Sequence, residues 1–230
     1  MSFIPNYQTE YRCLTNLNLY NSPQCNSLAT QAFTGRHLQI LPSNEDINKV
    51  LKIRLCEDNY IAWLSANDYD KIKTTEEKYQ PVTFNYEQIQ SKIPEIINFT
   101  LTAMNTPNYY LWGGTVAPNY DCSGLMQAAF YSQGIWIPRD SFQQQEFTQP
   151  ISFEELQIGD LIFFAKVEKI THVALYLGHS NYIHSSGKQF GRNGIGIDSI
   201  NPHTKEPVSQ AYLKQLKCAG RVIYNYNSLI

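Results

Sequence analysis

The hydrophobic pattern of this 230-residue chain changes near residue 81, and this change constrains the fold more than any other feature. Before it, short apolar runs alternate with turn-forming residues, a spacing that suits a small β-barrel or sandwich. The Asp and Asn of the stretch 56–59 tolerate positive φ and favour a hairpin there. The expected strands lie within residues 13–20, 37–41, 51–55 and 60–64. Residues 1–80 are therefore predicted to form an all-β module.

Beyond residue 81 the pattern becomes helical and then strand-like. Apolar residues at helical spacing predict a helix that begins near residue 86 and restarts at Pro94, and a second helix over residues 124–133. Asp121 is placed to cap this second helix and Gly134 to end it. The strand candidates that follow are residues 161–165, 172–177, 181–184, 195–197 and 220–226. Helices before strands, without βαβ alternation, predict an α+β domain over residues 94–230, with a linker and helix start at 81–93.

Charge and composition exclude several classes of protein. Eighteen basic and twenty acidic residues, with no cluster of Lys or Arg, argue against a nucleic-acid partner. Residues 1–6 lack the basic and apolar segments of an export signal, and every apolar run is far shorter than the ~20 residues that span a bilayer. A cytoplasmic protein with no membrane partner is therefore expected.

Cys122 is the candidate nucleophile among five scattered cysteines. The absence of CxxC, HExxH and phosphate-binding motifs predicts free thiols, no metal and no cofactor. Cys122 follows Asp121 at the first turn of a predicted helix, where backbone N–H groups and the helix dipole stabilise a thiolate. The alternative is that Cys122 is a small buried residue without chemistry.

Two of the five histidines share one face of a predicted hairpin. If residues 178–180 form a three-residue loop, paired positions sum to an even number, so His172 and His184 point to the same side of the sheet. With the helix of Cys122 packed over that face, His172 is the candidate base and His184 the group that orients its ring. The alternative for His184 is a half-buried residue bonded to a backbone carbonyl. The others, His37, His179 and His203, are expected on the surface.

Acyl-transfer chemistry also needs donors for an oxyanion. The N–H of Cys122 is one such donor by its position. The stretch YYLWGG at residues 109–114 lies just upstream, and its glycines let the backbone and a tyrosine hydroxyl approach the nucleophile closely. Plain core packing is the alternative role for these aromatic residues.

Five motifs in this order resemble the NlpC/P60 family of cell-wall cysteine peptidases. They are YLWGG at 110–114, DCSGL at 121–125, GDLIFF at 159–164, HVALYLG at 172–178 and YIHS at 182–185. The resemblance covers residues 94–226, and the N-terminal part is similar to a bacterial SH3-like barrel. It implies a papain-like catalytic domain that cleaves murein peptides as a γ-D-glutamyl-L-diamino-acid endopeptidase in cell-wall recycling.

The resemblance also implies roles for individual residues. Cys122 corresponds to the nucleophile, His172 to the general base and His184 to the third polar member, while Tyr110 directs its hydroxyl at the oxyanion. Substrate contacts are implied for Tyr60 of the barrel and for Asp121, Ser123, Arg139, Asp140 and Ser141. A solvated loop after Pro138 is the alternative for Arg139 and Asp140. A barrel Glu that some relatives use has no safe match here.

Three hypotheses about function remain. The first is a peptidase that acts on a murein tripeptide or tetrapeptide with a free N-terminal L-Ala. The second is a catalytically inactive protein that binds peptidoglycan as an adaptor, and an acyltransferase or amidase on the same fold is a third. Intact Cys122, His172 and His184 favour the peptidase. The sequence does not decide whether the diamino acid is meso-diaminopimelate or L-Lys, or whether the substrate is a free peptide or the intact wall. It does not decide the oligomeric state either.

Overall fold

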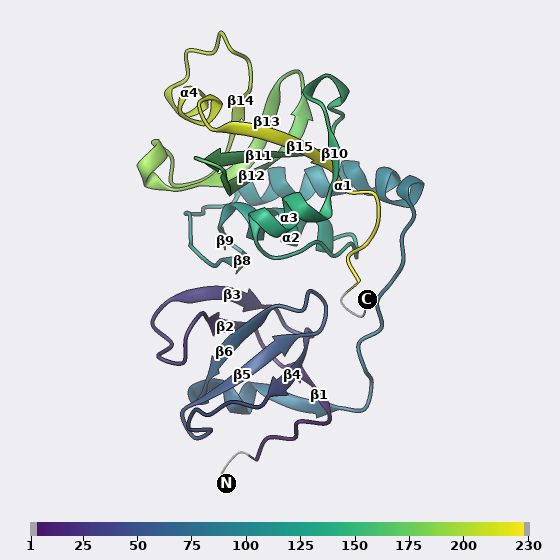
Figure 1. Ribbon diagram of the computed structural model, residues 1–230, viewed down its shortest axis with the longest axis vertical. Coiled ribbons are helices and arrows are strands. Elements are labelled where there is room, and N and C mark those ends of the chain that lie inside the picture. The colour runs from purple at the N-terminus through teal and green to yellow at the C-terminus, as the bar shows by residue number, and fades with distance from the viewer. Residues whose placement is uncertain (1–3, 228–230) are drawn as a thin grey trace. The chain divides into compact units, whose positions relative to one another are not determined.

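The computed structural model describes residues 4–227, which divide into two compact units (Figure 1). The first unit contains residues 4–81, residues 112–116 and residue 227, and the second contains Val82–Leu111 and Ala117–Tyr226. Within the described residues, no helix combines the length and the apolar character that a bilayer span requires.

The first unit is β-rich. Its elements are β1 (Glu10–Cys13), β2 (Leu17–Tyr20), β3 (Leu28–Ala32), β4 (His37–Leu41), β5 (Val50–Leu55), β6 (Ile61–Ser65), the 3-10 helix η1 (Ala66–Lys71) and β7 (Ile72–Thr75). The strands form one antiparallel sheet in the order β3-β2-β6-β5-β4-β1-β7. Alternating residues such as Leu19, Ile53 and Leu64 are fully buried in its core. The all-β prediction for this part of the chain is confirmed.

One hairpin predicted in this unit is present, and one predicted strand is divided in two. β5 and β6 pair as predicted, with Asn59 at a φ of 58° in the joint. The predicted run 13–20 is two strands, because the chain bends between them. At the bend, Leu14 N–H donates to Lys71 O at 2.8 Å and the side chain of Asn16 accepts from Thr34 N–H at 2.9 Å.

A buried charged cluster lies within the first unit, and it corrects the surface position predicted for His37. The His37 ring is buried, with Nδ1 2.9 Å from Glu10 Oε2. Arg36 beside it is also buried and contacts two carboxylates, Glu57 Oε2 at 3.1 Å and Asp58 Oδ1 at 2.9 Å. Pairing with neighbouring charges makes this burial possible. His179 and His203, by contrast, are exposed as expected.

The second unit combines helices with a six-stranded antiparallel sheet. Its helices are α1 (Tyr86–Asn105), α2 (Cys122–Tyr131), α3 (Ser141–Phe147), α4 (Pro207–Leu213) and the 3-10 helices η2 (Phe153–Glu155) and η3 (Lys188–Phe190). Its sheet strands are β10 (Gln149–Ile151), β11 (Leu161–Lys166), β12 (Lys169–Gly178), β13 (Asn181–Ser186), β14 (Gly194–Ser199) and β15 (Leu216–Arg221). The two-residue strand β9 (Asn119–Tyr120) precedes α2, and the two-residue strand β8 (Thr115–Val116) belongs to the first unit. The α+β prediction is confirmed.

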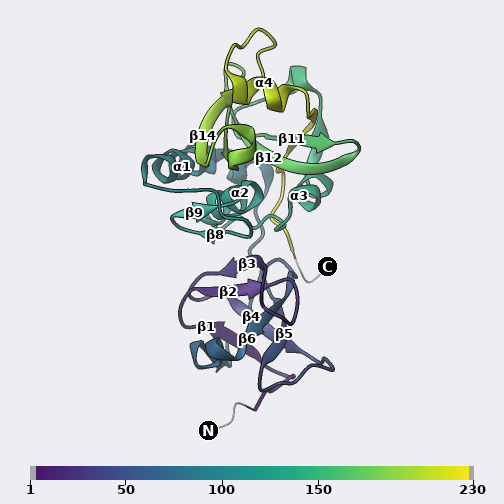
Figure 2. The same cartoon turned by 90° about the vertical axis from the view of Figure 1, so that its left-hand side faces the viewer.

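Both faces of this sheet are covered, in the strand order β10-β15-β11-β12-β13-β14. Figure 2 shows α1, α2 and α3 on one side of the sheet and α4 on the other. Odd-numbered residues such as Phe163 and Val173 pack against α1 and α2. Even-numbered residues such as Phe164 and Tyr182 pack against Tyr212 of α4. This alternation decides which side chains can meet in the site described below.

Two elements of the second unit differ from their predicted positions. α1 continues through Pro94 without a restart, because Ile89, Ile93 and Ile96 form one buried stripe that outweighs the backbone hydrogen bond lost at proline. β15 ends at Arg221, before most of the predicted strand 220–226. The later residues instead place the rings of Tyr224 and Tyr226 against Phe147, at centroid distances of 4.8 and 5.6 Å.

Candidate active site

The first turn of α2 presents Cys122, as the sequence predicts. Asp121 is the N-cap, and its Oδ1 accepts the N–H of Gly124 at 2.7 Å. Gly134 follows the helix with a φ of 77°, a conformation that favours glycine. Cys122 is thus the first residue of α2, where the backbone N–H groups have no partner within the helix.

His172 and His184 lie on the same face of the sheet, although the turn that arranges them differs from the prediction. The loop is a two-residue turn of His179 and Ser180, both at positive φ. By itself such a loop makes the numbers of paired residues sum to an odd number, which would put the two histidines on opposite faces. A bulge between Tyr176 and Gly178 adds one residue and restores the even sum. His172 and His184 therefore share one face as predicted, although the loop is shorter than expected and a bulge compensates for it.

The two histidines are in direct contact, and a carboxylate that the sequence analysis missed extends the row. His172 Nε2 lies 2.7 Å from His184 Nδ1, and His184 Nε2 lies 2.8 Å from Asp198 Oδ2. The three residues expose 7%, 0% and 5% of their surface respectively. The alternative that His184 is half-buried and bonded to a backbone carbonyl is therefore wrong. Asp198 lies one residue beyond the predicted strand 195–197.

The helix of Cys122 lies on the sheet face opposite the histidines, which corrects the expected packing. α2 packs on the odd-numbered face with Val173 and Leu175, whereas Tyr212 of α4 covers the histidine face. The pairing of β12 with β13 begins only at Leu175, so the two strands diverge before His172. Here the Cys122 sulfur accepts the backbone N–H of Val173, the residue that follows His172 in β12.

Burial sets the resting protonation of the pair. Burial raises the pKa of Cys122 to about 12, and the charge of Asp121 adds to it; N–H groups of Val173 and Ser123 and the charge of Arg139 offset this only in part. Burial, and then the neighbouring His184, lowers the pKa of His172 well below 6.5. Loss of hydration therefore opposes the stabilisation of a thiolate that is expected from the helix dipole. Burial thus favours an uncharged thiol at Cys122 and an uncharged imidazole at His172.

Two tyrosines complete the surroundings of the pair. Burial, and then the charges of Cys122 and Asp121, raise the pKa of Tyr110, so its hydroxyl stays protonated and can donate a hydrogen bond. The Tyr212 ring lies over His172 with centroids 4.5 Å apart and an interplanar angle of 33°. Its hydroxyl is 2.7 Å from Ser186 Oγ. Tyr212 was not predicted, because only the folded chain brings α4 to this face.

Arg139 lies buried at the start of α2, which rules out the solvated-loop alternative for this residue. Its Nη1 and Nη2 donate to Asp121 Oδ1 and Oδ2 at 3.1 and 2.7 Å, and Nη1 also donates to Ser123 Oγ at 2.9 Å. Arg139 exposes 1% of its surface. Asp140 is the N-cap of α3, and Ser141 begins that helix. Contacts of these five residues with substrate stay predictions.

Arg139→Ala is expected to lower the free energy of unfolding by about 3 kcal/mol or more, because it leaves the buried Asp121 carboxylate without its cation. Urea unfolding measures the change. Lys217→Ala is the matched control, because Lys217 forms an exposed pair with Glu168 at 2.7 Å. Its loss is expected to leave the free energy of unfolding close to that of the wild type, because solvent screens an exposed pair. Equal costs for the two variants would contradict the structural role of Arg139.

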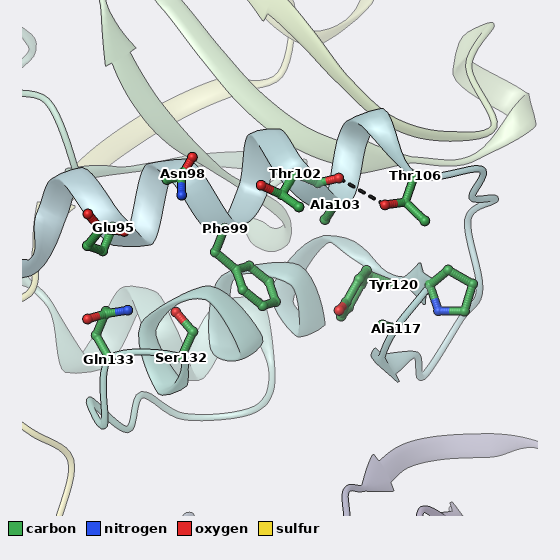
Figure 3. Close-up of a pocket in the computed structure, with 11 residues that line it drawn as sticks. Glu95, Asn98, Phe99, Thr102, Ala103, Thr106, Ala117, Tyr120, Ser132 and Gln133 are labelled. Atoms are coloured by element: carbon green, nitrogen blue, oxygen red, sulfur yellow. Dashed lines mark hydrogen bonds between the residues drawn. The ribbon is translucent and has the colours of Figure 1, made fainter.

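A separate cavity of about 370 Å³ lies between α1 and the segments that precede and follow α2 (Figure 3). The ring of Phe99 meets that of Tyr120 at its wall, with centroids 6.3 Å apart. Cys122 and His172 do not line it. Residues 4–227 hold no group of three or more His, Cys, Asp or Glu side chains arranged to bind a metal ion. Tyr60 belongs to the first unit, and its role toward substrate stays a prediction.

Known protein families match both units. Residues 107–217 match the NlpC/P60 family, and residues 19–68 match the bacterial dipeptidyl-peptidase SH3 domain. The chain is 35% identical over 127 residues to the γ-D-glutamyl-L-lysine dipeptidyl-peptidase of Bacillus cereus, which covers 54% of this chain and 34% of that protein. It is 34% identical over 104 residues to the murein DD-endopeptidase MepS/murein LD-carboxypeptidase of Escherichia coli, which covers 44% and 53%.

A solved structure agrees with these matches. The crystal structure of an NlpC/P60 family protein from Bacillus cereus aligns with 94% of this chain and 64% of its own, with a TM-score of 0.50 and 26% identity. The chain spans less than two thirds of each of these three proteins. The resemblance and the fold class stated from the sequence are confirmed. Residues 107–217 are therefore an NlpC/P60 domain, and they follow a bacterial dipeptidyl-peptidase SH3 domain over residues 19–68.

Proposed function

We propose that this chain is a cysteine peptidase that hydrolyses the bond between γ-D-Glu and the diamino acid of murein peptides with a free N-terminal L-Ala. The observation that carries the proposal is the Cys122 thiol at the backbone N–H of Val173, next in the chain to His172, whose ring is hydrogen-bonded to His184 at 2.7 Å. The name of the Bacillus cereus relative supports the γ-D-glutamyl specificity. A role in recycling of wall peptides belongs to the same proposal.

Acylation begins with a proton transfer, because the resting thiol and imidazole are both neutral. His172 takes the thiol proton as the Cys122 sulfur attacks the γ-carbonyl carbon of D-Glu. The negative charge that develops on the carbonyl oxygen has two candidate donors, the N–H of Cys122 and the hydroxyl of Tyr110. His172 then gives its proton to the departing amine of the diamino acid, which leaves a thioester on Cys122.

Deacylation repeats these steps with water as the nucleophile. His172 takes a proton from water, the hydroxyl attacks the thioester carbonyl, and the Cys122 sulfur leaves with that proton. The product is L-Ala-γ-D-Glu, and the free enzyme is restored. No step requires a metal ion or an organic cofactor.

Substrate recognition is the finer part of the proposal. A free α-ammonium needs a carboxylate, for which Asp140 at the start of α3 is the candidate, and the α-carboxylate of D-Glu needs a hydroxyl such as that of Ser141. Both carboxylate oxygens of Asp121 already accept from Arg139. We therefore assign Asp121, Ser123 and Arg139 mainly to holding the first turn of α2.

The test is mass spectrometry of products from L-Ala-γ-D-Glu-meso-diaminopimelate, its L-Lys counterpart and the N-acetylated form of each. Release of L-Ala-γ-D-Glu from the free peptides alone is the expected result. Cleavage of acetylated peptides as well would keep the peptidase and remove the amine requirement. Cleavage only at a D,D cross-link of a muropeptide would support the specificity named for the Escherichia coli relative. No cleavage of any of these substrates would favour the adaptor hypothesis.

A further inference from the structure

A buried row of three polar side chains determines where the protons of the site lie. His184 occupies its middle, 2.7 Å from His172 on one side and 2.8 Å from Asp198 on the other. Tyr182 and Tyr212 pack against the His184 ring at near-perpendicular angles, with centroids 5.1 and 4.8 Å away. Water is excluded from the middle of this row, so its hydrogen bonds fix the tautomer of each ring.

Asp198 is held as an ionised acceptor. Arg192 Nη2 donates to its Oδ2 at 2.7 Å, and Ser209 Oγ donates to its Oδ1 at 2.9 Å. Burial alone would raise the pKa of Asp198, but the hydrogen bonds with His184 and Ser209 and the charge of Arg192 outweigh burial and lower it. An ionised carboxylate has no proton to donate. The proton between Asp198 and His184 is therefore on His184 Nε2.

The neighbouring strand leaves room for this arrangement. Gly196 pairs with His184 in the ladder of β13 and β14. A Cβ at this position would collide with the guanidinium of Arg192. The missing side chain of Gly196 thus lets Arg192 reach the carboxylate of Asp198 across the strand.

The proton on His184 Nε2 determines which ring nitrogen of His172 carries a proton. Burial lowers the pKa of His184 although the hydrogen bond and charge of Asp198 raise it, so the ring carries a single proton at neutral pH. Its Nδ1 is then an acceptor, and His172 must donate from Nε2. His172 is neutral as well, which leaves a lone pair on its Nδ1.

We propose that Asp198 is a positioning residue that sets the tautomers of His184 and His172, so that His172 presents an unprotonated Nδ1 to the thiol of Cys122. The catalytic meaning of this assignment rests on the proposed function. The tautomers themselves exist in the free protein and can be measured without substrate. A purely structural role for Asp198, in which it only joins β14 to α4 through Ser209, is the competing explanation.

Two-bond ¹H–¹⁵N correlation spectra of protein labelled in histidine report which ring nitrogen carries the proton. In the wild type we expect Nε2–H for both His172 and His184 at neutral pH. Asp198→Ala leaves Arg192, which can only donate, as the nearest polar partner of His184 Nε2. Both rings are then expected to change to Nδ1–H, and kcat/KM is expected to fall by about 10²-fold or more.

Asp160→Ala is the matched control, because Asp160 is also buried and also accepts from an arginine, Arg221 Nε at 2.8 Å. Both variants lose a buried Asp–Arg pair and are expected to unfold at lower temperature than the wild type. Only Asp198→Ala should change the tautomers. Asp198→Asn keeps an oxygen opposite His184 Nε2, so it is expected to retain both Nε2–H tautomers and to recover most of the activity.

Unchanged tautomers in Asp198→Ala would overturn the assignment, even if the activity of this variant falls. Asp198→Leu, which has a similar shape and no acceptor, provides the same test if Asp198→Ala does not fold. Changed tautomers in Asp160→Ala would also count against the assignment. A wild-type protein that cleaves no murein peptide would contradict the proposed function alone, because the spectra require no substrate.

Discussion

Cys122→Ala is expected to lower kcat/KM for the murein tripeptide by at least about 10³-fold, because no other group near His172 can form the thioester. The substitution removes only a sulfur atom, and Asp121 still caps α2 through its 2.7 Å hydrogen bond to Gly124. The unfolding midpoint should therefore stay close to that of the wild type. Product formation followed by mass spectrometry measures the rate.

The control for Cys122 is a second cysteine in the same unit. Cys218 is a free, half-buried thiol in β15, and Cys218→Ala is expected to keep wild-type kinetics. This comparison matters because burial raises the pKa of both thiols, so the pKa alone does not single out Cys122. A Cys122→Ala protein that retains substantial turnover would remove Cys122 from the role of nucleophile.

His172→Gln is expected to reduce kcat/KM by a similar factor, at least about 10³-fold, because an amide cannot accept the thiol proton or return it to the leaving amine. Gln keeps a polar side chain opposite His184, so the loss is expected mainly in kcat. The exposed His203 supplies the control variant His203→Gln, which should behave as the wild type. Steady-state kinetics with the tripeptide separates kcat from KM.

The double variant Cys122→Ala/His172→Gln should be no slower than either single variant, because the two residues act in one proton transfer. If the losses in kcat/KM of the two single variants multiply in the double variant, His172 acts in a step other than proton transfer from Cys122. Thermal unfolding of all three variants gives the folded fraction against which the rates are compared.

Local signals in the sequence were sufficient for the fold class and for the first turn of α2. Asp121 and Gly134 bound α2 as their cap preferences predict, and the alternation along β12 and β13 places both histidines on one face. These features depend on neighbours within a few residues or on the period of a strand. They are therefore readable without knowledge of the tertiary structure.

The parts of the site that depend on distant segments could not be predicted. Tyr212 belongs to a short helix that follows a loop, and no local pattern places its ring over His172. Asp198 had a weak signal, because extending the predicted strand 195–197 by one residue puts an acid opposite Tyr182, on the histidine face. An acid on the buried face of a strand needs a partner, and His184 was the available one.

The protonation of Cys122 also depends on burial, which the sequence does not show. The dipole of α2 and its first N–H groups are local and visible in the sequence, and they favour a thiolate. The burial of the thiol at the opening between β12 and β13 appears only after folding, and it raises the pKa to about 12. Local electrostatics and burial thus act in opposite directions on the charge of Cys122, and its role as nucleophile stays a prediction.

The most direct test of the central claim is the reaction of the protein with the γ-p-nitrophenyl ester of L-Ala-D-Glu. An activated ester makes deacylation the slow step, so an acyl-enzyme accumulates. We expect a burst of one equivalent of p-nitrophenolate and a dipeptide acyl group on the tryptic peptide that carries Cys122. A burst that persists in Cys122→Ala, or an acyl group on another residue, would contradict the central claim.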